Sequence, residues 1–139
     1  MLLKKGLLII LILLLNSELI SQEIVVVITL SDTQVVEECH FGDDWEAHFS
    51  FGGKYRYSER GDNFLLKPNQ EFGLKSMIFE GKEEHSDYEE KVTIIKYDQL
   101  DVGRFKFEEL LYVEDENTGR YHCNNATFKF SYLIEVSLN

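Results

Sequence analysis

The amino-acid sequence predicts an all-β protein, folded as a single antiparallel β-sandwich of about seven to eight strands. Apolar and polar residues alternate along several short segments, turn-forming residues separate these segments, and no stretch has an extended helical periodicity. The number and spacing of the strands are typical of a sandwich, and a small β-barrel is the alternative. Because no internal repeat or linker is evident, we expect one domain over residues 22–139.

The first 21 residues are expected to be a cleaved signal peptide. Lys4 and Lys5 precede an unbroken apolar run over residues 7–15, and the small Ser21 suits a cleavage position. That run is too short for a membrane-spanning helix, which needs about 20 apolar residues. We therefore expect a secreted or periplasmic protein, residues 22–139, without a stable membrane span.

The first part of the mature chain is expected to form strands at residues 24–30 and 45–51. The first is β-branched and nearly all apolar, and the second alternates apolar with polar residues. Residues 34–39, between them, are compatible with one helical turn. After the second strand, a hairpin loop of odd length at Gly52-Gly53 would place Phe49 opposite Tyr57. Such aromatic pairs are favourable, so we expect this loop, with a glycine at positive φ.

Further strands are expected at residues 55–58, 72–80, 92–97, 104–113 and 128–136, and a short helical turn at 86–90. The segment 104–113 breaks its own alternation. Phe105 and Phe107 require one phase, whereas Leu110 and Tyr112 require the other. A β-bulge near residues 108–109 would return all four side chains to the apolar side, and we expect one there.

Composition restricts the possible functions. Acidic residues outnumber basic ones by 25 to 14, and the net charge of −11 disfavours binding to nucleic acid. The chain has neither the Gly-x-Ser-x-Gly elbow of serine hydrolases nor a Gly-x-x-x-x-Gly-Lys-Ser/Thr phosphate loop. We therefore expect a non-catalytic binding or accessory module that recognises a protein, a glycan or another cell-surface ligand. Tyr55 and Tyr57 are candidates for an aromatic ligand face.

Two alternative functions remain open from the sequence. A small secreted metal-assisted hydrolase would gather His40, Asp43, Asp44 and His122 around one pocket. An inhibitor of a secreted enzyme would present an exposed, rigid loop, for which residues 60–68 are the candidate segment.

Cys39 and Cys123 are the only two cysteines in the sequence. In an exported chain an even number of cysteines indicates a disulfide, and we expect these two to be joined. Two separate buried thiols are one alternative. The other is a zinc site, because His40 and His122 adjoin the two cysteines and this set of donors suits zinc.

Two acidic segments resemble those of a known family. Segment 24–30 leads to Asp32, and Asp43 and Asp44 follow before the next strand. Later, segment 92–97 runs into Asp98 and Asp101, followed by a glycine. This pattern resembles the calcium-dependent lipid-binding sandwich domains of the synaptotagmin type. The resemblance implies that Asp32, Asp43, Asp44, Asp98 and Asp101 could bind calcium, which prefers oxygen ligands. The loop after Asp98 is shorter than in that family, and its basic lipid-binding stretch is missing.

Overall fold

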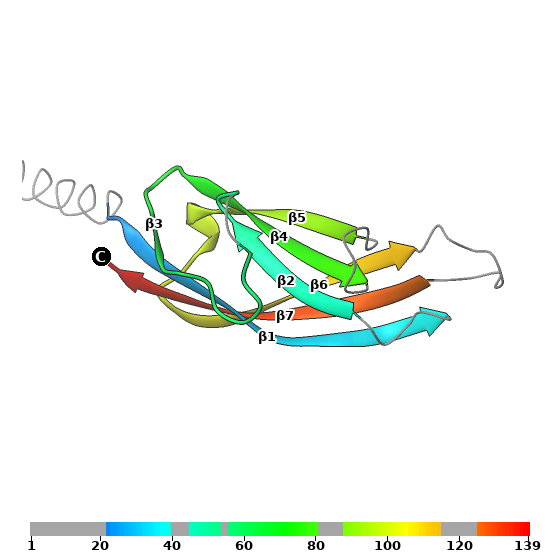
Figure 1. Cartoon of the computed structure of the whole chain (residues 1–139). Coiled ribbons are helices and arrows are strands. Elements are labelled where there is room, and N and C mark those ends of the chain that lie inside the picture. Colours follow the sequence, from blue (N-terminus) through cyan, green and yellow to red (C-terminus); the bar gives the residue numbers. More distant parts are fainter. Residues whose placement is uncertain (1–21, 40–44, 54–55, 81–87, 115–124) are drawn as a thin grey trace, which may run out of the picture.

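The computed structural model describes residues 22–39, 45–53, 56–80, 88–114 and 125–139. The strands are β1 Ile24–Cys39, β2 Trp45–Phe51, β3 Phe64–Leu66, β4 Glu71–Glu80, β5 Tyr88–Lys96, β6 Gly103–Glu114 and β7 Asn125–Leu138, and a short 3-10 helix, η1, spans Tyr97–Gln99. They form a four-stranded sheet of order β3-β1-β7-β6 and a three-stranded sheet of order β2-β4-β5 (Figure 1). All pairs are antiparallel, so the predicted β-sandwich is confirmed.

The long pairing of β1 with β7 forms the centre of the larger sheet. Ile24 lies opposite Leu138 at one end, and Cys39 lies opposite Asn125 at the other. Buried and half-buried residues alternate along β7 up to Val136, as the period-two pattern predicts. The helical turn expected over residues 34–39 is wrong, because β1 continues through them. Pairing with β7 outweighs the weak local preference of this segment. The pairing shifts register twice, between Leu30 and Asp32 and between Val35 and Glu37.

The smaller sheet is centred on β4, which pairs with β2 on one side and β5 on the other. The expected strands at 45–51, 72–80 and 92–97 are all present, the first with the expected ends and the other two with shifted ends. The helical turn expected at 86–90 is wrong over Tyr88–Glu90, because these residues begin β5 and pair with β4. The remainder of that turn lies outside the described residues.

The expected aromatic pairing beside the Gly52-Gly53 turn is confirmed. Phe49 and Tyr57 exchange two backbone hydrogen bonds, with N···O distances of 2.9 and 2.8 Å. Both glycines have positive φ, at 66° and 84°, which residues with a side chain rarely adopt. The expected strand at 55–58 is reduced to this single bridge at Tyr57 in the described residues.

Residues 57–63, which we call the crossing segment, run from the smaller sheet to the larger one. They close the side of the sandwich on which β2 and β1 lie. Leu30 donates its N–H to the carbonyl of Glu59 (2.7 Å), and Gly61 donates to the carbonyl of Ile28 (3.0 Å). The chain then forms β3 against the start of β1, a short strand that is not among those expected from the sequence. Main-chain hydrogen bonds therefore tie both sheets together along this edge.

Strand β6 has no bulge, so the expectation of one near residues 108–109 is wrong. Its pairing with β7 runs without a shift from Gly103 opposite Val136 to Glu114 opposite Asn125. The strict alternation places Glu109 on the core side, where it is 7% exposed. Leu110 and Tyr112 consequently face outward and are about half exposed. The core accepts a carboxylate here because polar partners are available, as described below.

The core lies between the two sheets. The largest fully buried side chains are Tyr132, Phe49, Phe128 and Phe130. Phe49 from the smaller sheet meets Tyr132 from the larger sheet edge to face, with ring centroids 5.6 Å apart. Burial of each such ring stabilises the fold by about 1.5–3 kcal/mol.

Candidate functional site

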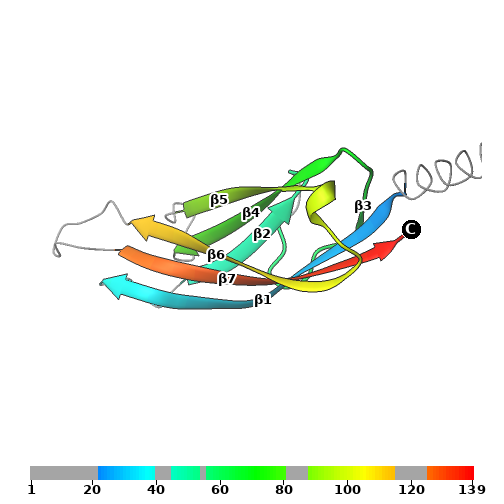
Figure 2. The same cartoon turned by 180° about the vertical axis from the view of Figure 1, so that it is seen from behind.

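The edge strands β5 and β6 lie next to each other on the side of the sandwich opposite the crossing segment (Figure 2). Side chains connect the two sheets here. Lys91 of β5 donates from Nζ to the backbone carbonyl of Leu110 on β6 (3.2 Å). Thr93 donates from Oγ1 to Oε2 of Glu109 (2.6 Å). This edge is therefore held by side-chain contacts, whereas the opposite edge is held by the main chain.

Glu109 belongs to a buried hydrogen-bond network that connects four strands. Ser76 of β4, fully buried, donates to Oε1 of Glu109, and Thr93 of β5 donates to Oε2. The hydroxyl oxygen of Tyr132, on β7, lies 2.5 Å from Ser76 Oγ. Because the single hydroxyl proton of Ser76 is donated to Glu109, Tyr132 must donate its own proton to Ser76. The carboxylate thus accepts two hydroxyl donors, one to each oxygen.

The pKa of Tyr132 is raised well above its ordinary value of about 10. Burial of the phenol is the main cause, since a phenolate would lose its hydration. The hydrogen bond with Ser76 acts in the opposite direction, and the negative charge of Glu109 raises the pKa further. Tyr132 therefore stays neutral and acts only as a hydrogen-bond donor at physiological pH.

This network aligns the two sheets. Each hydroxyl proton has an acceptor, and Ser76 and Tyr132 are fully buried. The sequence did carry a signal for it. Glu109 interrupts the apolar alternation of its segment, and this interruption marks a buried carboxylate and not the expected bulge.

The outer side of β6 presents an exposed strand edge. Leu110 and Tyr112 point outward from the larger sheet and are 53% and 54% exposed. Because the carbonyl of Leu110 faces β5, alternate backbone groups of β6 point away from β7. Within the described residues, no strand pairs with this side of β6. We call Lys106, Glu108, Leu110 and Tyr112, with their outward backbone groups, the β6 edge.

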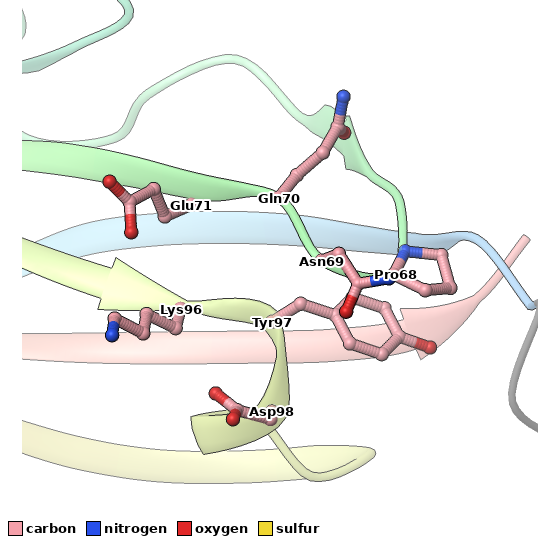
Figure 3. Close-up of a pocket in the computed structure, with 7 residues that line it drawn as sticks. All are labelled: Pro68, Asn69, Gln70, Glu71, Lys96, Tyr97 and Asp98. Atoms are coloured by element: carbon pink, nitrogen blue, oxygen red, sulfur yellow. The ribbon is translucent and has the colours of Figure 1, made fainter.

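A surface hollow of about 580 Å³ lies at the end of the smaller sheet, lined by Pro68, Asn69, Gln70, Glu71, Lys96, Tyr97 and Asp98 (Figure 3). A turn at residues 67–70 forms one wall, with Asn69 at a φ of 65° after Pro68, which is typical of a type II turn. Gln70 N–H donates to the carbonyl of Lys67 and closes this turn (3.1 Å). Helix η1 forms the opposite wall.

The hollow has little of the character of a ligand pocket. Its side chains do not converge: the Tyr97 ring lies beside Pro68 and Asn69, Lys96 extends the other way, and Gln70 points outward (Figure 3). The Tyr97 hydroxyl is already bonded to the carbonyl of Gln22 (2.6 Å). Ligand pockets usually bury most of the ligand and direct several polar groups toward it. We therefore do not assign a ligand to this hollow.

Tyr57 has a packing role in the structure. Its half-buried ring stacks on Phe51, with centroids 5.4 Å apart, and also contacts Phe49. Its hydroxyl is 3.4 Å from a carboxylate oxygen of Asp62. Tyr55, the other residue suggested for an aromatic ligand face, lies outside the described residues.

The described aspartates of the suggested calcium set are not brought together. Asp32 lies within β1 opposite Ser131 and accepts a hydrogen bond from Gln34 (2.6 Å). Asp98 is in η1, and Asp101 follows it before β6. Among the residues that the structure describes, no three metal-ligating side chains gather at one point. Asp43 and Asp44 lie outside this part of the chain, and calcium binding remains a prediction.

Several other suggested residues also lie outside the described part of the chain. These are His40, His122, Cys123 and the side chain of Cys39, so the disulfide, zinc and hydrolase hypotheses stay predictions. The segment 60–68, suggested as an inhibitory loop, can be placed. Arg60 bridges to Thr29, and β3 pairs with β1, so the segment packs along the larger sheet and does not protrude as an inhibitory loop should.

Comparison with known proteins finds no family model and no curated protein that matches this chain. The resemblance to calcium-dependent lipid-binding sandwich domains therefore remains a prediction. In the described residues, no helix has the length and apolar character that a membrane crossing requires.

Proposed function

We propose that this chain is a small exported binding module, acting outside the cytoplasm by recognising another protein and not by catalysis. The observation that supports this most directly is the β6 edge. It combines outward backbone hydrogen-bonding groups with two half-exposed apolar or aromatic side chains, Leu110 and Tyr112. Protein partners commonly add a strand to such an edge, where main-chain bonds supply affinity and side chains supply selectivity.

The chemistry of this edge favours a protein over a glycan. A sugar ring stacks on aromatic faces and needs hydrogen-bonding groups, whereas Leu110 offers only an apolar side chain. An exposed apolar residue beside an aromatic one is instead typical of protein interfaces, in which aromatic residues are enriched. The predicted signal peptide supports export, which places the partner in the periplasm, in the medium or at a cell surface.

Site-specific photo-crosslinking tests the proposal. A photoreactive phenylalanine derivative replaces Leu110 in one full-length variant and Leu65 of β3 in a matched variant. These leucines have nearly equal exposure, 53% and 52%, and lie on the opposite edge strands of the same sheet. Both variants are exported from the source cells and irradiated there. We expect a discrete protein adduct from position 110 and none from position 65.

Two outcomes would contradict the proposal. If position 110 forms no adduct, the β6 edge has no protein partner. If positions 110 and 65 form the same adducts, the contact is unspecific. Mass spectrometry of the crosslinked peptide identifies the partner and shows whether the adduct contains β6.

A further inference from the structure

We infer that the β6 edge pairs with the β6 edge of a second copy of this chain, in antiparallel orientation. The inference rests on the proposed function only in using the same edge as the binding surface. The two copies would join their larger sheets into one continuous sheet across a two-fold axis. Such an interface is isologous, so the edge must be complementary to itself.

The charges of β6 meet this requirement. The exposed cations Arg104 and Lys106 lie near its start, and the exposed carboxylates Glu108 and Glu114 lie at its middle and its end. Antiparallel pairing of two copies therefore places the basic start of each strand beside the acidic end of the other. Opposite charges directly across a strand pair are favourable, and like charges are unfavourable.

The register centred on Leu110 satisfies the backbone and pairs Lys106 with Glu114. With Leu110 on the two-fold axis, Leu110 faces Leu110 of the second copy, and Lys106 faces Glu114. Tyr112 then faces Glu108 and lies diagonally across from both Leu110 and Lys106, within reach of its ring. All of these residues have the same strand phase, so the outward backbone groups of both copies meet as antiparallel pairing requires.

Three other described edges of the sandwich, those of β1, β2 and β3, are less suited to this pairing. The free part of β1 contains two register shifts, and such irregularities discourage edge-to-edge contact. Strand β2 is bridged to the crossing segment at Phe49, and β3 spans only three residues. Strand β6 is twelve residues long and regular. Lys91 covers one of its carbonyls, and its flexible ammonium group must move to solvent when a strand docks.

Sedimentation analysis of the mature chain tests the inference. A single strand pair with few apolar contacts makes a small interface, so we expect a reversible monomer–dimer equilibrium within roughly 1–500 μM. Leu110→Glu should weaken dimerisation by tenfold or more, since it places two carboxylates on the two-fold axis. Leu65→Glu, with the same change in charge and exposure, should leave the equilibrium unchanged.

A charge exchange tests the register. Lys106→Glu places like charges opposite each other twice in the dimer and should weaken it by about three- to tenfold. Adding Glu114→Lys to the Lys106→Glu variant should restore the wild-type equilibrium. Lys67→Glu alone, a control with the same change in charge, should not weaken dimerisation. Circular dichroism confirms that each variant is folded. Amide hydrogen exchange should also slow at Lys106 and Leu110 as the protein concentration rises.

The outcomes separate this inference from the proposed function. A chain that stays monomeric over this range, or a dimer that Leu110→Glu and Leu65→Glu affect equally, overturns the inference. A dimer that the second charge change fails to restore overturns the register centred on Leu110. If the chain is monomeric but position 110 crosslinks to a different protein, the inference is wrong and the proposed function stands.

Discussion

Glu109 shows how one polar residue can specify the relative position of two sheets. Its two carboxylate oxygens accept hydrogen bonds from Ser76 on β4 and Thr93 on β5, while its own strand belongs to the other sheet. A buried carboxylate is costly unless both oxygens are satisfied. A slip of one sheet along the other would break both bonds, so the network disfavours other alignments.

Glu109→Gln should lower the free energy of unfolding by about 1–3 kcal/mol, because an amide has one acceptor oxygen where the carboxylate has two. Its NH2 group would then face a hydroxyl that needs an acceptor. The matched control is Glu108→Gln on the exposed side of the same strand, with an expected change within about 0.5 kcal/mol. Urea unfolding followed by fluorescence measures both. Equal costs for the two variants would contradict a special role for Glu109.

Tyr132 should make the fold sensitive to alkaline pH. Its pKa is raised in the folded state, so its stabilising contribution is complete below the unfolded pKa of about 10 and is lost as the pH rises above that value. Above pH 10 the free energy of unfolding should fall more steeply in the wild type than in Tyr132→Phe. The difference in slope should approach about 1.4 kcal/mol per pH unit. Parallel curves for the two proteins would show that Tyr132 does not contribute.

Gly61 allows the crossing segment to lie close to the aromatic core. A Cβ at this position would be 2.5 Å from Cε1 of Phe51, whose ring also packs on Phe64. Gly61→Ala should therefore destabilise the fold by about 1–3 kcal/mol, because the ring must move. The neighbouring exposed Asn63→Ala serves as a control. Thermal unfolding measures both, and no change in the melting temperature of Gly61→Ala would refute the steric argument.

At the scale of elements, the sandwich is closed differently on its two sides. The crossing segment joins β2 to β1 by main-chain hydrogen bonds, but β5 and β6 are joined only through the side chains described above. Main-chain hydrogen bonds occupy the backbone N–H and C=O groups of the edge that they close. Side-chain bonds leave the outward backbone groups of β6 available, which is why the proposed binding surface lies there.

The predicted disulfide would join the end of β1 to the residues just before β7. Cys39 is paired with Asn125 at the start of β7, and Cys123 is only two residues before Asn125 in the sequence. Non-reducing peptide mapping of the exported protein should show the two cysteines linked. On the chain-entropy model, a bridge closing so long a loop stabilises the fold by roughly 4–5 kcal/mol. Two thiols that react with an alkylating agent in the folded protein would contradict this prediction.

At the scale of the whole molecule, both ends of the described chain are built into the fold. The C-terminal Asn139 donates to the carbonyl and the carboxylate of Glu23, at 3.2 and 2.7 Å. Tyr97 binds the carbonyl of Gln22. The start of β1 and the end of β7 thus lie together at one end of the sandwich (Figure 1).

The exported protein should begin at or near Gln22. The short apolar run and its basic start predict cleavage after Ser21, and the residues that follow are those bonded to Tyr97 and Asn139. Intact-mass analysis of protein recovered outside the cytoplasm is the measurement. Substituting Ser21 with a bulky residue should delay processing, whereas the same change at Ser17 serves as a control. A mature mass that retains Met1 would overturn the prediction of a cleaved signal.

The sequence by itself determined the fold class, most strands and the Phe49–Tyr57 pairing. These depend on local alternation and on glycine conformation, which the residues of each segment specify. Only the tertiary structure decided the role of Glu109 and the outward position of Leu110. Both depend on whether Glu109 is buried, which requires hydroxyl donors from strands distant in the sequence. The residue pattern of segment 104–113 alone is compatible with either a bulge or a buried carboxylate. The β6 edge could be identified only from the strand order, because an edge strand is one that has a hydrogen-bonded neighbour on one side only.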